Sequence, residues 1–91
     1  MNKKRLLQKV LTGSQNVRFS DLVGLIEALG FILTRTNGSH HIFKHPDMQE
    51  MVNIQNVRGE AKPYQVRQVV ELIEAYGLTL DAGDADNAEE E

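Results

Sequence analysis

Hydrophobic residues recur with two different periods along this chain, and the change of period separates helices from strands. Three segments repeat apolar residues every three to four positions, which is the period of an amphipathic helix. They are residues 3–12, residues 20–29 and a segment that begins at Pro63. Ser20 is a favourable N-cap residue for the second helix, and Pro63 suits the first position of the third. Gly77 is typical of a helix end and closes the third segment.

Between the second and third helices the pattern changes to short runs of β-favouring residues, which predict strands. We expect three strands, at residues 31–36, 41–45 and 51–55, followed by a loop over residues 59–62. Asn37-Gly38 favours a type I′ hairpin turn between the first two strands. The order of two helices, three strands and a helix predicts an α+β fold, in which a three-stranded antiparallel sheet carries the helices on one face.

All three histidines of the chain lie on or beside the second predicted strand. Alternation places His40 and Ile42 on one face of this strand, and His41, Phe43 and His45 on the other. Ile42 could face the core, but an aromatic side chain buries a larger area. We therefore expect Phe43 to face the helices and His40 to face solvent.

This arrangement bears on whether the histidines bind a metal ion. Because His40 points away from His41 and His45, the three rings cannot converge on one ion, and we predict neither a metal site nor a cofactor. His41 and His45 are assigned to packing and hydrogen bonding, and His45 is expected to cap the turn at Pro46-Asp47.

An exposed imidazole near a cation is a candidate acid–base site, since histidine side chains exchange a proton near neutral pH. Cleavage of RNA requires a base for the 2′-hydroxyl proton and an acid for the departing 5′-oxygen. Lys44 or Arg35 would stabilise the charge on the phosphate. The alternative for His40 is an ordinary surface residue. Strict alternation places Arg35 on the face of Leu33, where its stem could instead pack over apolar surface.

Charge is unevenly distributed along the chain. The net charge is −3, but residues 81–91 hold six acids and no base, which leaves residues 1–80 with ten bases and seven acids. We expect the acidic tail to be disordered. In the basic part, Arg58 and Lys62 precede the last helix, whose start favours anions, so RNA phosphates are candidate ligands. A solvated loop is the alternative for these two residues.

The length of 91 residues allows one domain. We assign residues 1–80 to it, of which residues 1–18 form an N-terminal extension with an extra helix. The apolar stripe of this helix either covers the core of its own chain or forms a homodimer interface. The chain has no cysteine. No apolar run approaches the roughly 18 residues of a membrane span, so we expect a cytoplasmic protein without membrane contact.

Three strings carry a resemblance to a known family: EALGFILTRT, NGSHHIFKHPD and KPYQVRQVVELIEAYGL. Together they resemble the HicA (YcfA-like) mRNA interferase toxins over roughly residues 19–78. The resemblance implies a fold similar to a double-stranded-RNA-binding domain and cleavage of mRNA without metal. It also implies that His40 is catalytic, that Gly38 and Ser39 shape its approach, and that a HicB-like antitoxin covers the active face.

The chain also departs from the family pattern. After the third strand it reads IQNVRGEAKP, where members often carry a Pro-His stretch, and the N-terminal helix and acidic tail are additions. We therefore keep two alternatives to a ribonuclease toxin. One is a solitary relative that binds RNA without cutting it, and the other is a protein-interaction domain of the same fold. Asn53 and Gln55 should look out beside His40, because they alternate with Val52 and Ile54.

Overall fold

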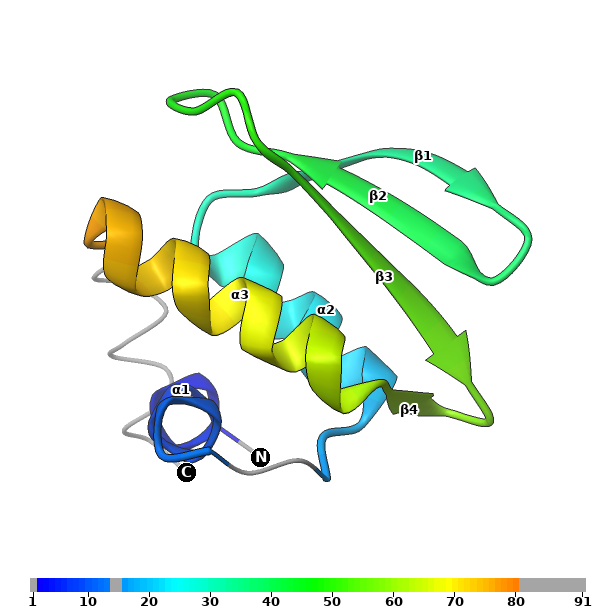
Figure 1. The fold of residues 1–91 in the computed structure, drawn as a ribbon, viewed down its shortest axis with the longest axis horizontal. Coiled ribbons are helices and arrows are strands. Elements are labelled where there is room, and N and C mark those ends of the chain that lie inside the picture. Colours follow the sequence, from blue (N-terminus) through cyan, green and yellow to red (C-terminus); the bar gives the residue numbers. More distant parts are fainter. Residues whose placement is uncertain (1, 14–15, 81–91) are drawn as a thin grey trace.

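The computed structural model describes residues 2–13 and 16–80, and it has the predicted α+β architecture (Figure 1). The expected acidic tail, residues 81–91, lies outside the described residues. The elements in chain order are α1 (Lys3–Leu11), α2 (Phe19–Ala28), β1 (Ile32–Asn37), β2 (His40–Lys44), β3 (Met51–Val57), β4 (Glu60–Ala61) and α3 (Pro63–Tyr76). None of the described helices is long and apolar enough to cross a membrane.

The antiparallel sheet has four strands in the order β1-β2-β3-β4, one strand more than expected. The extra strand, β4, occupies part of the segment predicted as a loop. A two-residue turn at Arg58 and Gly59 connects it to β3, with positive φ angles of 55° and 86°. Positive φ at both positions is the type I′ pattern. The side chain of Asn56 supports this turn, since its Oδ1 accepts a hydrogen bond from the Gly59 N–H at 2.7 Å.

The turn between β1 and β2 differs from the prediction. Asn37 pairs directly with His40, so Gly38 and Ser39 form the turn in place of Asn37-Gly38. Gly38 has a φ of 61°, whereas Ser39 is outside the positive region. Positive φ at the first position alone fits a type II′ turn, and the predicted type I′ turn is wrong. The consequence is that β2 starts one residue earlier, at His40.

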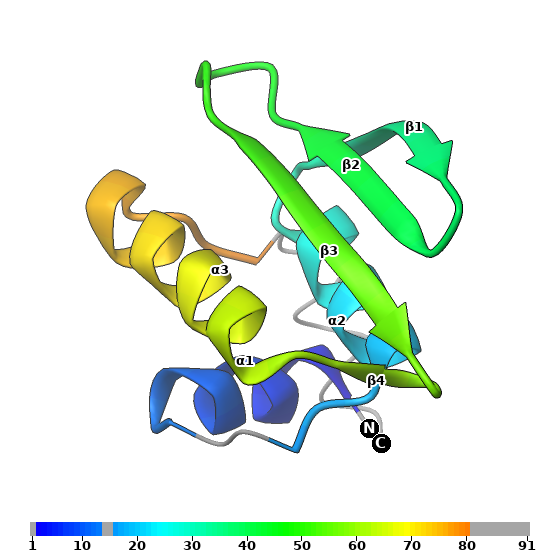
Figure 2. The ribbon, with the colours of Figure 1, turned by 45° about the vertical axis from the view of Figure 1, so that its right-hand side comes forward.

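The core lies between the sheet and the helices α2 and α3. Phe43 is 0% exposed, which confirms that it faces the helices, and it packs with Val52 and Ile54 of β3. α1 lies on the side of α2 and α3 that is remote from the sheet (Figures 1 and 2). Its Leu6 and Val10 are buried in the same core. Most of the N-terminal stripe therefore covers the core of its own chain, whereas Leu11 of the same stripe is 41% exposed.

The ends of α3 agree with the predictions from capping residues, whereas the start of α2 does not. α3 begins at Pro63 and ends before Gly77, which has a φ of 61°, as predicted. α2 begins at Phe19, with Arg18 as the N-cap residue, so the Ser20 cap is wrong. The Phe19 N–H donates to the carbonyl of Gly59 at 2.9 Å, and Arg18 forms a bridge with Glu60. A tertiary contact with β4 therefore sets this helix start.

Candidate functional site

His40 is positioned by β2, on the face of the sheet opposite the helices. Phe43, three positions further along β2, points into the core, and residues an odd number apart on a strand face opposite sides, so the His40 side chain points to the open face. Asn37 lies directly opposite it on β1, and Gln55 lies opposite it on β3. The side chain of His40 is only partly buried, which leaves it accessible to a ligand on this face.

A hydrogen bond orients the imidazole. Nδ1 of His40 lies 3.1 Å from Oδ1 of Asn53, one step diagonally along β3. An amide oxygen can only accept a hydrogen bond, so Nδ1 carries the hydrogen in this arrangement. In a neutral ring the other nitrogen, Nε2, then has a free lone pair. The expected position of Asn53 and Gln55 beside His40 is confirmed, and this pair gives the ring the tautomer of a general base.

A β-bulge brings Arg35 to the same face as His40. The pairing shifts between Leu33 and Arg35, so that Leu33 pairs with Phe43 on the helix side while Arg35 pairs with Ile42 on the open side. The expectation that Leu33 and Arg35 share a face is therefore wrong, because the extra residue reverses the alternation. Arg35 is a diagonal neighbour of His40, at roughly 7–8 Å between strands.

Lys44 shares the open face with His40 but lies further away. The two residues are four apart on one extended strand, which corresponds to roughly 13 Å. Lys44 pairs with Ile32 and Met51 at the other end of the sheet. The structure therefore places Arg35, and not Lys44, as the nearer of these two cations to the imidazole.

The turn before β2 is tied to β3 next to His40. Nε2 of Gln55 donates to the hydroxyl of Ser39 at 3.3 Å, and the Asn56 N–H donates to the Ser39 carbonyl at 3.0 Å. A Cβ atom at Gly38 would meet no atom of the described residues within 4 Å, its chain neighbours apart, so glycine suits this position because of its positive φ and not because space is short. Gly38 and Ser39 thus form the turn that leads directly into His40.

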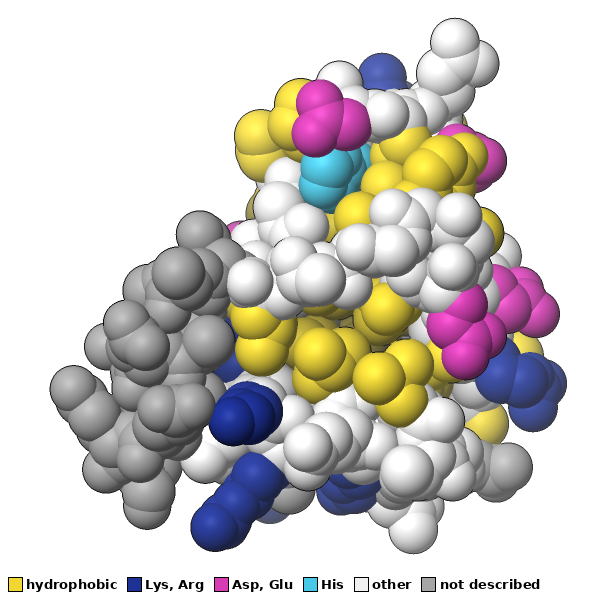
Figure 3. Space-filling model, turned by 90° about the vertical axis from the view of Figure 1, so that its left-hand side faces the viewer, with side chains coloured by type: hydrophobic (Ala, Val, Ile, Leu, Met, Phe, Trp, Pro, Cys, Tyr) yellow, Lys and Arg dark blue, Asp and Glu magenta, His cyan; other side chains and the backbone are white. Residues whose placement is uncertain are grey.

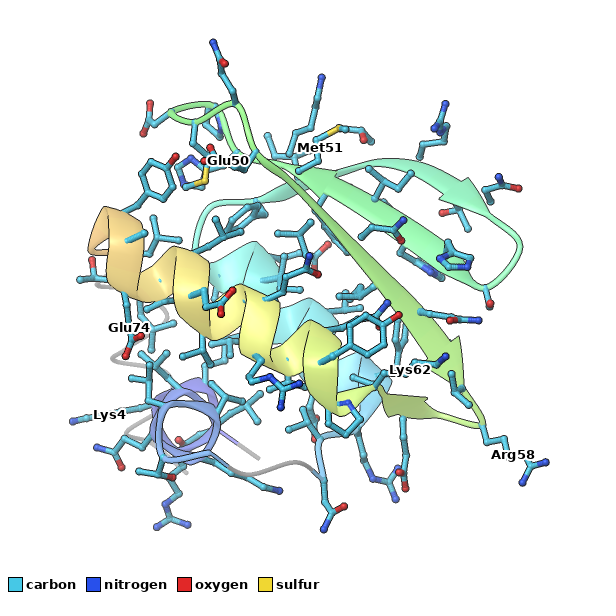
Figure 4. The ribbon with its side chains drawn as sticks, in the orientation of Figure 1. Lys4, Glu50, Met51, Arg58, Lys62 and Glu74 are labelled. Atoms are coloured by element: carbon cyan, nitrogen blue, oxygen red, sulfur yellow. The ribbon has the colours of Figure 1, made fainter. Side chains whose placement is uncertain are left out.

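Arg58 and Lys62 lie at the β4 end of the sheet (Figure 4). Arg58 occupies the turn three residues beyond Gln55, roughly 10 Å along the strand. Lys62 is the N-cap residue of α3, and its Nζ lies 5.9 Å from the ring centre of Tyr64, which is 52% exposed. This geometry adds an accessible aromatic ring to the basic residues at this end.

The other two histidines have structural partners. His41 packs edge-on against Phe19 with 4.8 Å between ring centres. His45 packs edge-on against Phe31, accepts the Asp47 N–H at Nδ1 and donates from Nε2 to the Leu29 carbonyl. The prediction that His45 caps its turn is confirmed.

Gly30 makes room for the His45 ring. A Cβ atom at Gly30 would lie 2.8 Å from Nε2 of His45. Within residues 2–13 and 16–80 no three His, Cys, Asp or Glu side chains gather in a way that could hold a metal ion.

Gln65 is a polar residue of the fold that the sequence did not single out. It is 3% exposed, and its Oε1 accepts the Gln55 N–H at 2.8 Å while its Nε2 donates to the Tyr64 hydroxyl at 3.5 Å. Its position in the sequence, next to Val66 and four residues before Val69, places it on the apolar side of the helix and could have indicated a buried polar side chain. Gln65 joins the start of α3 to the strand that supports His40.

A family model described as HicA toxin of bacterial toxin-antitoxin matches residues 19–78. The chain belongs to the HicA toxin family. The matched segment runs from the start of α2 to just beyond α3, so it contains the whole sheet with His40 and leaves out α1. Searches of curated proteins and of solved structures returned no match. The HicA family places this chain among the toxins of bacterial toxin–antitoxin systems.

Proposed function

We propose that this HicA-family protein is an endoribonuclease that cleaves mRNA without a metal ion, with His40 as the proton-transfer residue. The observation that carries the proposal is the His40–Asn53 pair on the open face of the sheet. It presents one oriented imidazole nitrogen to whatever binds there. The family match supports a toxin role, and RNA is the substrate that the family resemblance implies.

The proposed reaction follows from the tautomer of the ring. Nε2 of His40 removes the proton of a ribose 2′-hydroxyl, and the 2′-oxygen attacks the adjacent phosphorus. The bond from phosphorus to the 5′-oxygen of the next nucleotide breaks, and solvent protonates that oxygen. The products are a 2′,3′-cyclic phosphate and a free 5′-hydroxyl. The guanidinium of Arg35 is the cation nearest the imidazole among those considered, and it stabilises the extra negative charge on the phosphate.

The remaining basic residues extend the proposed RNA path. Gly38 and Ser39 form the turn that leads into His40, Arg58 and Lys62 contact phosphates at the β4 end, and Lys44 does so at the opposite end. These contacts carry no sequence information by themselves, so they support binding of many RNA sequences.

An antitoxin is the proposed protein partner. The family is defined by toxin–antitoxin systems, and a HicB-like antitoxin that covers the open face would block access to His40. We do not propose a homodimer through α1, because Leu6 and Val10 of its apolar stripe are buried in the core of the same chain.

The deciding experiment compares the wild-type protein with His40→Ala on a mixed-sequence RNA. We expect cleavage to fall by about 100-fold or more, because general acid–base catalysis contributes about 10²–10⁴ to a rate. RNA affinity should change little, since the phosphate contacts remain. Equal cleavage by both proteins would remove the catalytic assignment of His40. Binding without products in the wild type would favour the RNA-binding relative over the enzyme.

A further inference from the structure

The outer edge of β3 is without a strand partner over most of its length. β4 pairs only with Asn56 and Val57, so from Met51 to Gln55 no described strand lies on that side. α3 runs alongside this edge in the opposite direction (Figure 2). An exposed strand edge is a template for pairing with another extended chain.

The hydrogen bonds show which backbone groups of β3 face outward. The Asn56 N–H points to β2, where it bonds Ser39, whereas the Gln55 N–H points away from β2 and bonds Gln65. Outward and inward groups alternate along an antiparallel strand. The N–H and C=O groups of Met51 and Asn53 therefore point to the outer edge. Gln65 closes the edge at one end and leaves it open toward Met51.

A hollow of about 520 Å³ lies at that open end, between the start of β3 and the second half of α3. We call it the β3/α3 groove. Its lining residues are Glu50, Met51, Val52, Gln68, Glu71, Leu72, Ala75 and Tyr76. Met51 is 57% exposed, and Figure 4 shows it with Glu50 at the start of the strand. Figure 3, which faces the left-hand side of Figure 1, shows hydrophobic side chains beside acidic ones, with Lys and Arg side chains mainly below and to the right.

The charge of the groove restricts what can bind there. Among residues 2–13 and 16–80, the charged side chains that line it are Glu50 and Glu71, and no Lys or Arg of these ranges does so. RNA would meet like charge in this groove. The tail of this chain would too, because residues 81–91 hold six acids. A second copy that offered its own β3 edge would bring the same two glutamates. The complementary ligand is an extended peptide with basic side chains.

We propose that the β3/α3 groove binds an extended, basic segment of a protein partner, which adds as a strand to the outer edge of β3. The backbone of β3 supplies hydrogen bonds, the apolar lining receives alternate side chains, and Glu50 and Glu71 pair with Lys or Arg. The groove lies at the Met51–Lys44 end of the sheet, and His40 lies at the other end. The inference therefore does not depend on the proposed ribonuclease activity.

The test uses a fluorescein-labelled hexapeptide of alternating valine and lysine as the probe, with alternating valine and glutamate as its matched control. Fluorescence anisotropy measures binding to the full chain. We expect the lysine peptide to bind and the glutamate peptide to bind at least roughly tenfold more weakly, which is about 1.4 kcal/mol. Equal binding of the two peptides, or no binding of either at millimolar protein, would overturn the proposal.

Two variants locate the binding. Met51→Pro removes an outward N–H without breaking a bond to β2, and Glu71→Lys reverses one charge. Each should weaken binding by roughly tenfold, the effect of one good hydrogen bond or ion pair. Glu27→Lys makes the same charge change on α2, outside the groove, and should stay within about twofold of wild type. Circular dichroism checks each fold. Folded Met51→Pro and Glu71→Lys proteins that bind as the wild type does would contradict the assignment.

Discussion

At the scale of single residues, the site depends on the amide of Asn53 as much as on the imidazole. Oδ1 of Asn53 holds Nδ1 of His40 and so selects which ring nitrogen meets the ligand. Without this partner the ring can rotate or exchange tautomers, and the base would be present but wrongly oriented for part of the time. Asn53 is therefore a positioning residue in the proposed reaction.

Substituting Asn53 tests that role. Asn53→Ala should lower the cleavage rate by up to roughly 100-fold, since small losses of alignment cost about that much. RNA affinity should stay within about twofold, because the phosphate contacts are untouched. Asn53→Asp keeps an acceptor oxygen and should restore most of the rate. Single-turnover kinetics with measured RNA binding separate the two quantities. A rate for Asn53→Ala equal to that of the wild type would show that the hydrogen bond does not matter.

At the scale of elements, α3 is linked to β3 by a buried side chain as well as by apolar packing. Gln65 replaces a neighbouring strand by accepting the Gln55 N–H, and Gln55 in turn supports the turn before His40. This link determines where the open edge of β3 begins. It also connects the start of the helix to the proposed RNA-binding face.

Gln65→Leu removes this acceptor and leaves the part-buried Gln55 N–H without its partner. We expect the free energy of unfolding to fall by about 1 kcal/mol, the lower end of the cost of an unsatisfied buried group. Gln68→Leu is the matched control on the same helix, because Gln68 is exposed. Its effect should stay within about 0.5 kcal/mol. Urea unfolding followed by circular dichroism measures both. Equal stabilities of the two variants would argue against a structural role for the Gln65 link.

The same scale shows what the sequence could and could not predict. The helices, three of the strands and the inward side of Phe43 follow from periodicity and side-chain size. The bulge that turns Arg35 toward His40 and the two residues of β4 could not be foreseen, since both arise from pairing between strands. The start of α2 at Phe19 also depends on a distant contact, with Gly59. Local rules fail here where long-range hydrogen bonds override them.

At the scale of the whole molecule, the free energy of unfolding should depend on pH through the hydrogen bond between Tyr76 and Glu50, two residues that line the β3/α3 groove. The Tyr76 hydroxyl donates a hydrogen bond to the carboxylate of Glu50. This bond lowers the pKa of Glu50 below its ordinary 4.5, and it raises the pKa of Tyr76 above its ordinary 10.0. The titratable neighbours that line the adjoining hollows are Asp47 and Glu71.

The sign of the effect follows from linkage. A lowered carboxyl pKa stabilises the fold above the unfolded pKa, and this gain is lost as the pH falls through the folded pKa. A raised tyrosine pKa stabilises the fold below pH 10.0, and this gain is lost as the pH rises through the folded pKa. Tyr76→Phe should therefore be less stable than the wild type at neutral pH, and the difference should shrink in acid and in strong base.

Thermal unfolding over a pH series checks this prediction. Tyr64→Phe is the matched control, because its hydroxyl lies against Gln65 and not against a carboxylate. Its difference from the wild type should be the same at neutral pH and in acid. A Tyr76→Phe difference that stays constant from neutral pH into acid would mean that the Glu50 contact does not form in solution.

Leu6 and Val10 lie outside the segment that matches the family model, yet they are buried in the same core as its residues. The segment that matches the family starts at Phe19, yet the backs of α2 and α3 are covered by a helix that precedes it. A protein truncated to that segment would expose the hydrophobic surface that α1 covers, and it would be prone to aggregation. The N-terminal helix thus covers the backs of α2 and α3, and among the described residues it lies on the side of the molecule opposite the sheet face that carries His40.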